Sequence, residues 1–316
     1  MKILTYDEVD HDQVLIMHMS GFGWPLTEER ARAMAEHDKR LWKLFGIYAV
    51  KGDKVLGQII PFRLRLRSTE GLADQLGVAE VVTAPDETRK GVATALMKRI
   101  EELGVEAGME TSWLMTGEHL VANNLYRKLG YFNVSTFPRG FKRIPKNQPK
   151  GSGIKLGQYR KADAKKLAGI HKEYLNGSLG FTERQWDFLE VGIATQQLGK
   201  DAIKVASRAG EIVGYAVSSP RDGVAFIMEV AAPDERDFGS IVTTLEGQYK
   251  GSLVVGSSLV WKRQRGRFAS LGYQIRPTHW YRLMAKPLEK GMSRRELEHA
   301  YGLDDGRFAF MSLDGF

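Results

Sequence analysis

The chain has 316 residues, 43% of them hydrophobic and 27% charged, with a formal net charge of +8 and no cysteine. This length is enough for two average domains of a well-packed protein. The lack of cysteine excludes disulfides, thiolate metal sites and a cysteine nucleophile. No apolar run predicts a membrane span or a secretory signal, so we expect a cytoplasmic protein that does not associate with membranes.

The positive charge favours polyanionic partners, such as nucleic acid or a phosphorylated cofactor. The basic residues are spread along the chain and are not gathered in one tract, which argues against nucleic acid. The seven histidines are scattered, without the i, i+4 spacing of a metal-binding pair. We therefore expect no metal site.

The apolar periodicity of the first half predicts both strands and helices. In chain order, we expect a helix over 26–45, a hairpin over 46–67, a strand over 77–85, a helix over 91–108, a strand over 110–117, and a helix and strand over 119–134. Thr27 is the expected N-cap of the first helix, the hairpin turns at Gly52, and Gly130 ends the last helix. This order predicts a mixed α/β domain.

Two parts of the chain resemble each other. TAPDETRKGVATALMKRIE from Thr83 resembles AAPDERDFGSIVTTLEGQY from Ala231, and YRKLGY ending at Tyr131 resembles FASLGY ending at Tyr273. Matches in the same order at similar spacing predict two copies of one fold. The segment 137–155 is rich in proline, glycine and cations, which is typical of a linker. The predicted division is a first domain over 1–145, a second over 146–288 and a C-terminal tail over 289–316.

The stretch VVTAPDETRKGVATALMKRI, from Val81, predicts a strand, a short polar loop and an amphipathic helix. A helix begins with N–H groups that have no intrahelical partner, and glycine at Gly91 lets the backbone approach a ligand closely. With the charges of Arg89 and Lys90, these groups form a cradle for a phosphate or pyrophosphate. The alternative is an ordinary strand–helix turn with solvated cations.

This loop resembles motif A of the GNAT superfamily, the N-acetyltransferases that use acetyl-CoA, and is most similar to that of Eis-like and other tandem-GNAT proteins. Gly91 and Ala93 match the motif, whereas Thr88 stands where the family has Gln or Arg. Downstream, HLVANNLYRKLGYFNV resembles motif B, with His119 where Asn is common. The resemblance implies two tandem GNAT-like domains, each a mostly antiparallel twisted sheet flanked by helices.

By this resemblance, acetyl-CoA is the co-substrate, and its pantetheine arm pairs with the strand edge that precedes the loop. A backbone N–H on that edge polarises the thioester carbonyl. The implied cofactor-binding residues are Val81, Val82, Thr83, Thr88, Arg89, Lys90, Gly91, Val92, Ala93, Thr94, His119, Asn123 and Asn124.

Transfer to an amine needs an acid for the leaving thiolate and a base for the amine proton. Tyr126 of motif B is the implied acid, because a phenol with a pKa of about 10 matches a thiolate of similar basicity; a packed core tyrosine is the alternative. Glu80, on the strand beside the thioester, is one implied base. A bulge in this strand would decide to which face of the sheet the Glu80 side chain points. Eis-like enzymes instead carry the base on the chain terminus, here Phe316.

The acceptor pocket is expected near GFGWPLTEER, which begins at Gly21. Trp24 is either a wall of this pocket or a packing residue. His18, Glu28 and Glu29 lie in the segment that lines the acceptor cleft in this family, which makes them possible substrate contacts.

The second copy departs from the motifs. Asp237 and Phe238 replace the two cations, Ile241 replaces Ala93, and Phe268 replaces Tyr126. We therefore do not expect this copy to bind CoA by the same route.

Together these features predict an N-acetyltransferase that transfers an acetyl group from acetyl-CoA to a small-molecule or peptide amine, with one active site in the first domain. The alternative is a non-catalytic tandem-GNAT protein that senses acyl-CoA or another ligand.

Overall fold

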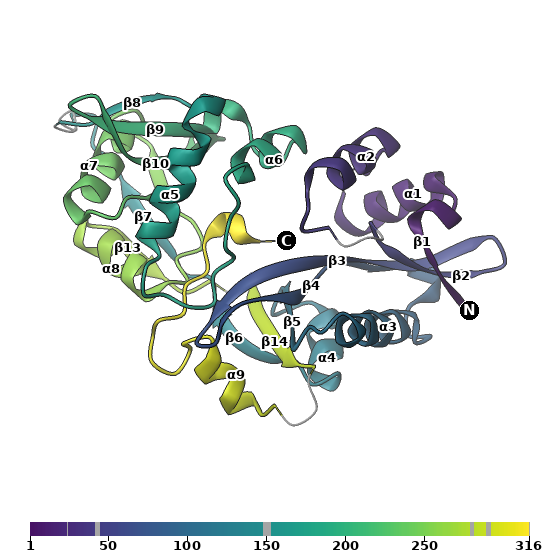
Figure 1. The fold of residues 1–316 in the computed structure, drawn as a ribbon. Helices are drawn as coiled ribbons and strands as arrows, with labels where there is room; N and C mark the ends of the chain where they lie inside the picture. Colours follow the sequence, from purple (N-terminus) through teal and green to yellow (C-terminus); the bar gives the residue numbers. More distant parts are fainter. Residues whose placement is uncertain (24, 42–44, 148–152, 279–280, 289–291, 316) are drawn as a thin grey trace.

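The structure is a computed structural model that describes residues 1–316 except 24, 42–44, 148–152, 279–280, 289–291 and 316. Two sheets form two halves of the molecule, each flanked by helices (Figure 1). The mixed α/β fold with two mostly antiparallel sheets is thereby confirmed.

The first sheet has seven strands in the order β1-β2-β3-β4-β5-β14-β6. Their bounds are β1 (Lys2–Thr5), β2 (Ile47–Lys51), β3 (Lys54–Ser68), β4 (Gly71–Thr83), β5 (Thr111–Thr116), β14 (Arg282–Pro287) and β6 (Phe132–Thr136). All neighbours pair antiparallel except β4 and β5, which are parallel. The hairpin predicted around Gly52 is confirmed, because Lys51 pairs with Lys54 across the turn.

The second sheet has seven strands in the order β13-β7-β12-β11-β10-β9-β8. Their bounds are β13 (Gln274–Arg276), β7 (Arg139–Arg143), β12 (Leu253–Gly256), β11 (Val224–Ala231), β10 (Glu211–Arg221), β9 (Ile203–Arg208) and β8 (Lys155–Gln158). Again one central pair, β11 and β12, is parallel and the others are antiparallel. The two sheets therefore share one plan.

Helices cover both faces of the first sheet. The helices α1 (His11–Phe22) and α2 (Glu28–His37) lie on one face, and α3 (Val92–Glu106) and α4 (Val121–Lys128) lie on the other (Figure 1). Apolar side chains at i, i+4 and i+8 of α3, namely Val92, Leu96 and Ile100, pack on the sheet in one core cluster. The α1 and α2 side chains pack in a separate cluster on the opposite face.

The second half carries α5 (Ala164–Tyr174), α6 (Phe188–Ala194), α7 (Glu235–Glu246) and α8 (Lys262–Ser270), and α9 (Arg294–Ala300) follows β14. Between the halves α6 contacts α2. The last described residues lie in the same region, above β3 (Figure 1).

The sheets exchange a strand, which the sequence analysis did not anticipate. β7, in the segment 137–155 that we expected to be a linker, pairs with β12 and β13 of the second sheet. β14, from the second half of the chain, lies between β5 and β6 of the first sheet. The linker interpretation of 137–155 was therefore wrong. The division of the chain at residue 145 stays a prediction, and the membership of β7 and β14 in the two sheets does not follow it.

Two equivalent glycines relate the copies. A Cβ on Gly57 would lie 2.7 Å from the carbonyl oxygen of Val82 and 2.9 Å from Cγ1 of Val92. A Cβ on Gly214 would lie 2.8 Å from the carbonyl oxygen of Ala231 and 2.5 Å from Cδ1 of Ile241. In both sheets only glycine leaves room for the helix that follows the next strand, which is α3 after β4 and α7 after β11. Ile241 thus corresponds to Val92, one residue before the Ala93 that the sequence match paired with it.

One helix is shorter than predicted. The helix expected over 26–45 ends at His37, because Asp38 leaves the helical conformation and its carboxylate binds the backbone and guanidinium of Arg40. Its N-cap is Thr27, as predicted, and the Thr27 hydroxyl accepts a hydrogen bond from the Arg30 N–H.

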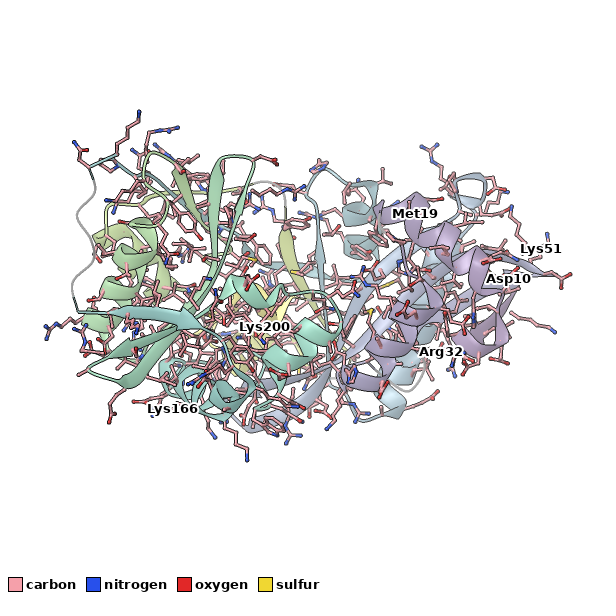
Figure 2. All side chains as sticks on the ribbon, turned by 90° about the horizontal axis from the view of Figure 1, so that it is seen from above. Asp10, Met19, Arg32, Lys51, Lys166 and Lys200 are labelled. Atoms are coloured by element: carbon pink, nitrogen blue, oxygen red, sulfur yellow. The ribbon has the colours of Figure 1, made fainter. Side chains whose placement is uncertain are left out.

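Charged side chains surround both halves. Figure 2 labels Arg32 and Lys51 on the N-terminal half and Lys166 and Lys200 on the C-terminal half, far from one another. The excess positive charge is thus distributed over the molecule.

Candidate active site

The strands β4 and β5 separate in the middle of the first sheet. β4 pairs with β5 only from Leu76 to Val78, although β4 continues to Thr83 and stays paired with β3. In the described part of the chain, the β5-facing edge of residues 79–83 has no strand partner. Val81, Val82 and Thr83 lie on this edge, which can bind an extended ligand as an added strand would.

The helix α3 begins at the loop that the sequence analysis singled out. Gly91 is its N-cap, with φ +86°. The first intrahelical bond runs from the Ala95 N–H to the Gly91 carbonyl, at 2.9 Å. The N–H groups of Val92, Ala93 and Thr94 therefore precede the intrahelical ladder, and no described side chain caps them. This is the arrangement that binds a phosphate.

The cations of the loop differ in their surroundings. Arg89 is exposed and has a left-handed backbone, with φ +63°. The ammonium of Lys90 lies 3.2 Å from the Glu87 carboxylate, which offsets part of its charge. The Thr88 hydroxyl donates to the carbonyl of Pro85 at 3.0 Å and thus holds the turn.

The helix α4 brings motif B to the same sheet. Tyr126 is buried against the α3 side of the sheet, and its ring packs edge-on against Tyr131 at 6.0 Å. Burial raises the pKa of Tyr126 to about 12. Asn123 is also buried: its Oδ1 accepts a bond from Arg127 at 2.9 Å, while its Nδ2 has no partner among the described residues. His119 and Asn124 are exposed.

Glu80 lies at a bulge in β4. The register against β3 shifts between Gln58 and Ile60, and Glu80 has a φ of +52°. Such strain in a non-glycine residue occurs preferentially at functional sites. The side chain is 23% exposed. Burial raises the pKa of Glu80 to about 7, although Arg30 opposes this shift.

A histidine and a glutamine lie behind Glu80. His18 is fully buried, and burial, assisted by Arg30, lowers the pKa of His18 to about 4. The Gln58 amide nitrogen lies 2.9 Å from Nε2 of His18, and Nδ1 of His18 lies 3.6 Å from the Glu80 carboxylate. If the amide donates to Nε2, the single proton of the neutral ring resides on Nδ1 and faces Glu80. Gln58 was not predicted from the sequence. The one feature that marks it there is its position as a polar residue within an otherwise apolar stretch of β3.

A cavity of about 400 Å³ opens beside Glu80, between the two halves. Its wall combines Glu80 of β4 and Met115 of β5 with Arg30 of α2 and Arg40, and with Phe188 of α6. The C-terminal segment contributes Ser312, Leu313 and Gly315. Both halves of the chain are therefore needed to form this cavity.

The predicted substrate residues lie elsewhere or outside the described chain. Glu28 is exposed and pairs with Arg32 at 2.5 Å and with His11 at 3.8 Å. Glu29 is exposed, and neither glutamate lines the cavity beside Glu80. Trp24 and Phe316 lie outside the described residues. From α2, Arg30 and Met34 line that cavity instead, one and two turns into the helix.

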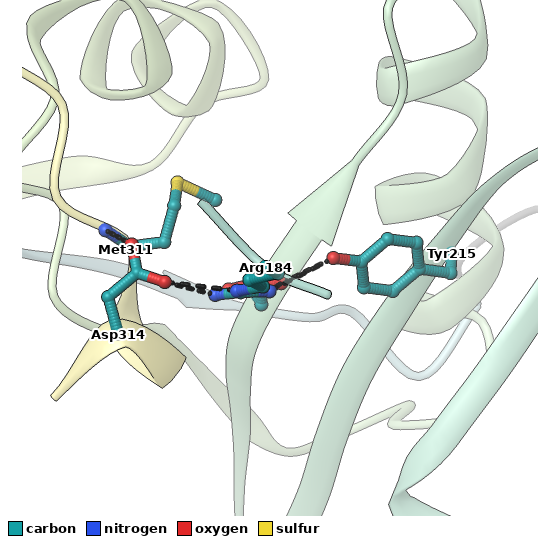
Figure 3. A network of polar contacts seen from close by, with 5 residues as sticks. Arg184, Tyr215, Met311 and Asp314 are labelled. Atoms are coloured by element: carbon teal, nitrogen blue, oxygen red, sulfur yellow. Dashed lines mark hydrogen bonds and ion pairs between the residues drawn. The ribbon is translucent and has the colours of Figure 1, made fainter. Parts of the chain in front are cut away.

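The second half contains a buried ion cluster (Figure 3). The guanidinium of Arg184, 3% exposed, binds Glu229 of β11 at 2.5 and 2.7 Å and Asp314 at 2.8 Å. Tyr215 donates to Glu229 at 2.6 Å, and Asp314 accepts the N–H of Met311 at 3.0 Å. The cluster holds the C-terminal segment on the second half, next to Ser312, Leu313 and Gly315, which line the Glu80 cavity.

The N-terminus of α7 also differs from that of α3. Asp234 is its N-cap, and its carboxylate accepts the Asp237 N–H at 2.9 Å. The carboxylate of Asp237 lies 2.7 Å from Arg208. Two carboxylates thus lie where α3 offers N–H groups, and Phe268 is buried in the core. This geometry is unfavourable for a pyrophosphate.

Across the described ranges, no group of three or more His, Asp or Glu side chains is placed to hold a metal ion. In the same residues, no helix is both long enough and apolar enough to span a membrane.

The family model of the acetyltransferase (GNAT) domain matches residues 2–133. No curated protein sequence matches the chain. Among solved structures, a probable N-acyltransferase from Enterococcus faecalis is similar, with a TM-score of 0.69 and 16% identity over 91% of this chain and 72% of that one. A GCN5-related N-acetyltransferase from Kribbella flavida has a TM-score of 0.67 and 19% identity, over 91% and 72%. Eis1 from Mycobacterium abscessus has a TM-score of 0.62 and 15% identity, over 92% and 74%.

At identities of 15–19%, the solved structures show that the fold is shared. The family match lies on the half of the chain that carries the separated strands, the α3 loop and Glu80. Residues 2–133 therefore match the GNAT acetyltransferase domain, and the whole chain is similar in fold to these solved structures.

Proposed function

We propose that this protein is an N-acetyltransferase that transfers an acetyl group from acetyl-CoA to a small-molecule or peptide amine, at a single active site in its N-terminal half. The observation that carries the proposal is Glu80, a half-buried carboxylate with a raised pKa of about 7, at the wall of a cavity where β4 and β5 separate. A base with a pKa near the working pH is the most effective one.

The residues of this half fit acetyl-CoA. The N–H groups of Val92, Ala93 and Thr94 would hold the pyrophosphate, with Arg89 adding charge. The free edge of residues 79–83 would pair with the pantetheine arm, and the Nδ2 of Asn123 offers a buried donor that still lacks an acceptor. When bound, the co-substrate supplies the activated acetyl group.

In this proposal, the nitrogen of the acceptor amine bonds to the acetyl carbon, and Glu80 accepts the proton that this nitrogen loses. The carbon–sulfur bond breaks, and Tyr126 donates a proton to the departing thiolate. The pKa of about 12 keeps this phenol protonated at neutral pH. His18, through Nδ1, and Gln58 orient the Glu80 carboxylate. The alternative base, the terminal carboxylate of Phe316, stays a prediction, supported by the position of Gly315 on the cavity wall.

Replacing Tyr126 by Phe tests the acid. We expect kcat to fall about 100-fold, because the thiolate must then leave without a proton donor. The affinity for acetyl-CoA should change less than about twofold, since the ring is retained and the hydroxyl contributes to the chemical step. Thiol release with a panel of amines measures kcat, and calorimetry measures affinity. Equal turnover by the wild type and by Tyr126→Phe would show that Tyr126 is a packing residue of the core and not the acid.

Replacing Gly91 by Ala tests the pyrophosphate cradle. A φ of +86° costs an L-residue about 1–2 kcal/mol, so the loop should shift and the Kd for acetyl-CoA should rise about tenfold. Gly108→Ala is the matched control: it follows the same helix, has φ +75°, and its new Cβ, like that at Gly91, meets no atom within 4 Å. The control should lose similar stability and keep the Kd. A Kd that rises equally in both variants would refute the cradle.

The alternative function is acyl-CoA sensing without turnover. It predicts acetyl-CoA binding that Gly91→Ala weakens, but no thiol release with any amine. The cytoplasmic location expected from the sequence stays a prediction.

A further inference from the structure

A second cavity, of about 230 Å³, adjoins the one beside Glu80. The two cavities share Arg40, Phe188 and Val191 in their walls. An acceptor whose amine faces Glu80 can therefore extend past Arg40 into the second cavity.

Arg40 is an oriented guanidinium at the junction. Its side chain is 17% exposed, and its Nε and Nη2 donate to Asp38 at 2.9 and 2.7 Å. Its central carbon lies 5.7 Å from the centre of the Phe62 ring and 5.6 Å from that of Phe188. The remaining nitrogen, Nη1, is buried and has no hydrogen-bond partner in the described chain. A buried donor without an acceptor is costly unless a ligand supplies one.

Further cations line the second cavity. Arg63 and Arg65 project from β3 into its wall. Arg63 lies 3.5 Å from Asp74, whereas Arg65 has no carboxylate partner among the residues that the structure describes. In the Glu80 cavity the charged wall residues are Arg30, Arg40 and Glu80, and Glu80 is only partly ionised at neutral pH. Four carboxylates also line the second cavity, namely Asp38, Asp74, Glu183 and Asp187. Three of them lie beside Arg40, Arg63 and Arg67, so Nη1 of Arg40 and the guanidinium of Arg65 remain to attract a negative group.

We propose that the acceptor is an amine that also carries a carboxylate, with the carboxylate bound by Arg40 and Arg65 and the amine facing Glu80. This inference rests on the proposed function, because it names the class of acceptor for the same site. Guanidinium groups favour carboxylates, since two N–H groups can bind the two oxygens. In the Glu80 cavity, Arg30 and Arg40 also favour the neutral form of the amine, which is the form that attacks.

The test compares matched pairs of acceptors: ω-amino carboxylates of three to six carbons and the corresponding carboxamides. Thiol release from acetyl-CoA gives kcat/KM, and calorimetry in the presence of CoA gives binding. The full-length wild type should favour the best carboxylate over its carboxamide about 10- to 100-fold, the range of a charged hydrogen-bonded pair.

Two variants should reduce this ratio about tenfold. Arg40→Lys keeps a charge beside Asp38 but removes the free nitrogen, and Arg65→Gln removes an exposed charge. Arg221→Gln is the control and should leave the ratio unchanged, because Arg221 lies on an exposed strand end, 3.5 Å from the Asp222 carboxylate.

Carboxamides that react and bind as well as carboxylates would overturn this inference while leaving the acetyltransferase proposal intact. A ratio that falls equally in Arg221→Gln would also overturn it, because bulk charge would then explain the preference. Absence of thiol release with every amine would refute the proposed function, and the acceptor class with it.

Discussion

Glu80→Gln should lower kcat by about 100- to 1,000-fold, the usual contribution of a positioned base. In the wild type, kcat/KM should rise with pH and level off above about pH 7, where Glu80 is ionised. The variant has no group that titrates there, so its residual activity should not follow this profile. Thiol release measured from pH 5.5 to 9 over a range of amine concentrations gives kcat/KM for both proteins.

Stability provides the control for this substitution. Folding raises the pKa of Glu80 from its ordinary value of 4.5 to about 7. The protonated carboxyl therefore stabilises the fold below about pH 4.5, and this contribution is lost as the pH rises through 7. The glutamine cannot ionise, so the variant should be at least as stable as the wild type at pH 8. A well-folded variant that retains the wild-type pH profile would show that another group, such as the terminal carboxylate, is the base.

Arg184→Met should destabilise the protein by about 3–5 kcal/mol, because it leaves two buried carboxylates, Glu229 and Asp314, without their cation. Burial alone would raise the pKa of Glu229, but Arg184 reverses this and lowers the pKa overall. Without Arg184, one or both carboxyls must take up a proton to remain buried. Chemical denaturation at pH 7 measures the loss.

The control is Arg221→Met, whose ion pair with Asp222 has both side chains more than 80% exposed; it should change stability by less than about 0.5 kcal/mol. Asp314→Asn should be milder than Arg184→Met and should raise the acceptor KM, because it loosens the segment whose next residue, Gly315, lines the Glu80 cavity. If Arg184→Met costs no more than its control, the cluster does not hold the C-terminal segment.

The local features of the site were predictable from sequence. The α3 loop was recognised from Gly91 and its neighbouring cations, because the N-terminus of a helix is set by nearby residues. The two copies were recognised from the resemblance between the segments that begin at Thr83 and Ala231. The structure adds that Gly57 and Gly214 serve the same packing contact in each sheet.

The features that the sequence could not reveal depend on contacts between distant segments. The bulge at Glu80 is set by the register between β3 and β4. The exchange of β7 and β14 depends on which strands each of them meets. β7 consists of three cations, one glycine and Phe141, so no alternation of apolar residues is visible. Arg184 and Asp314 lie 130 residues apart in the chain, so no local pattern links them.

The most direct test of the central claim is a crystal structure of the protein with acetyl-CoA. We predict one bound molecule, with its pyrophosphate on the N–H groups of Val92, Ala93 and Thr94 and its thioester between β4 and β5, beside Glu80. A nucleotide bound at the N-terminus of α7, beside Asp234, would contradict the assignment of the active site to the N-terminal half.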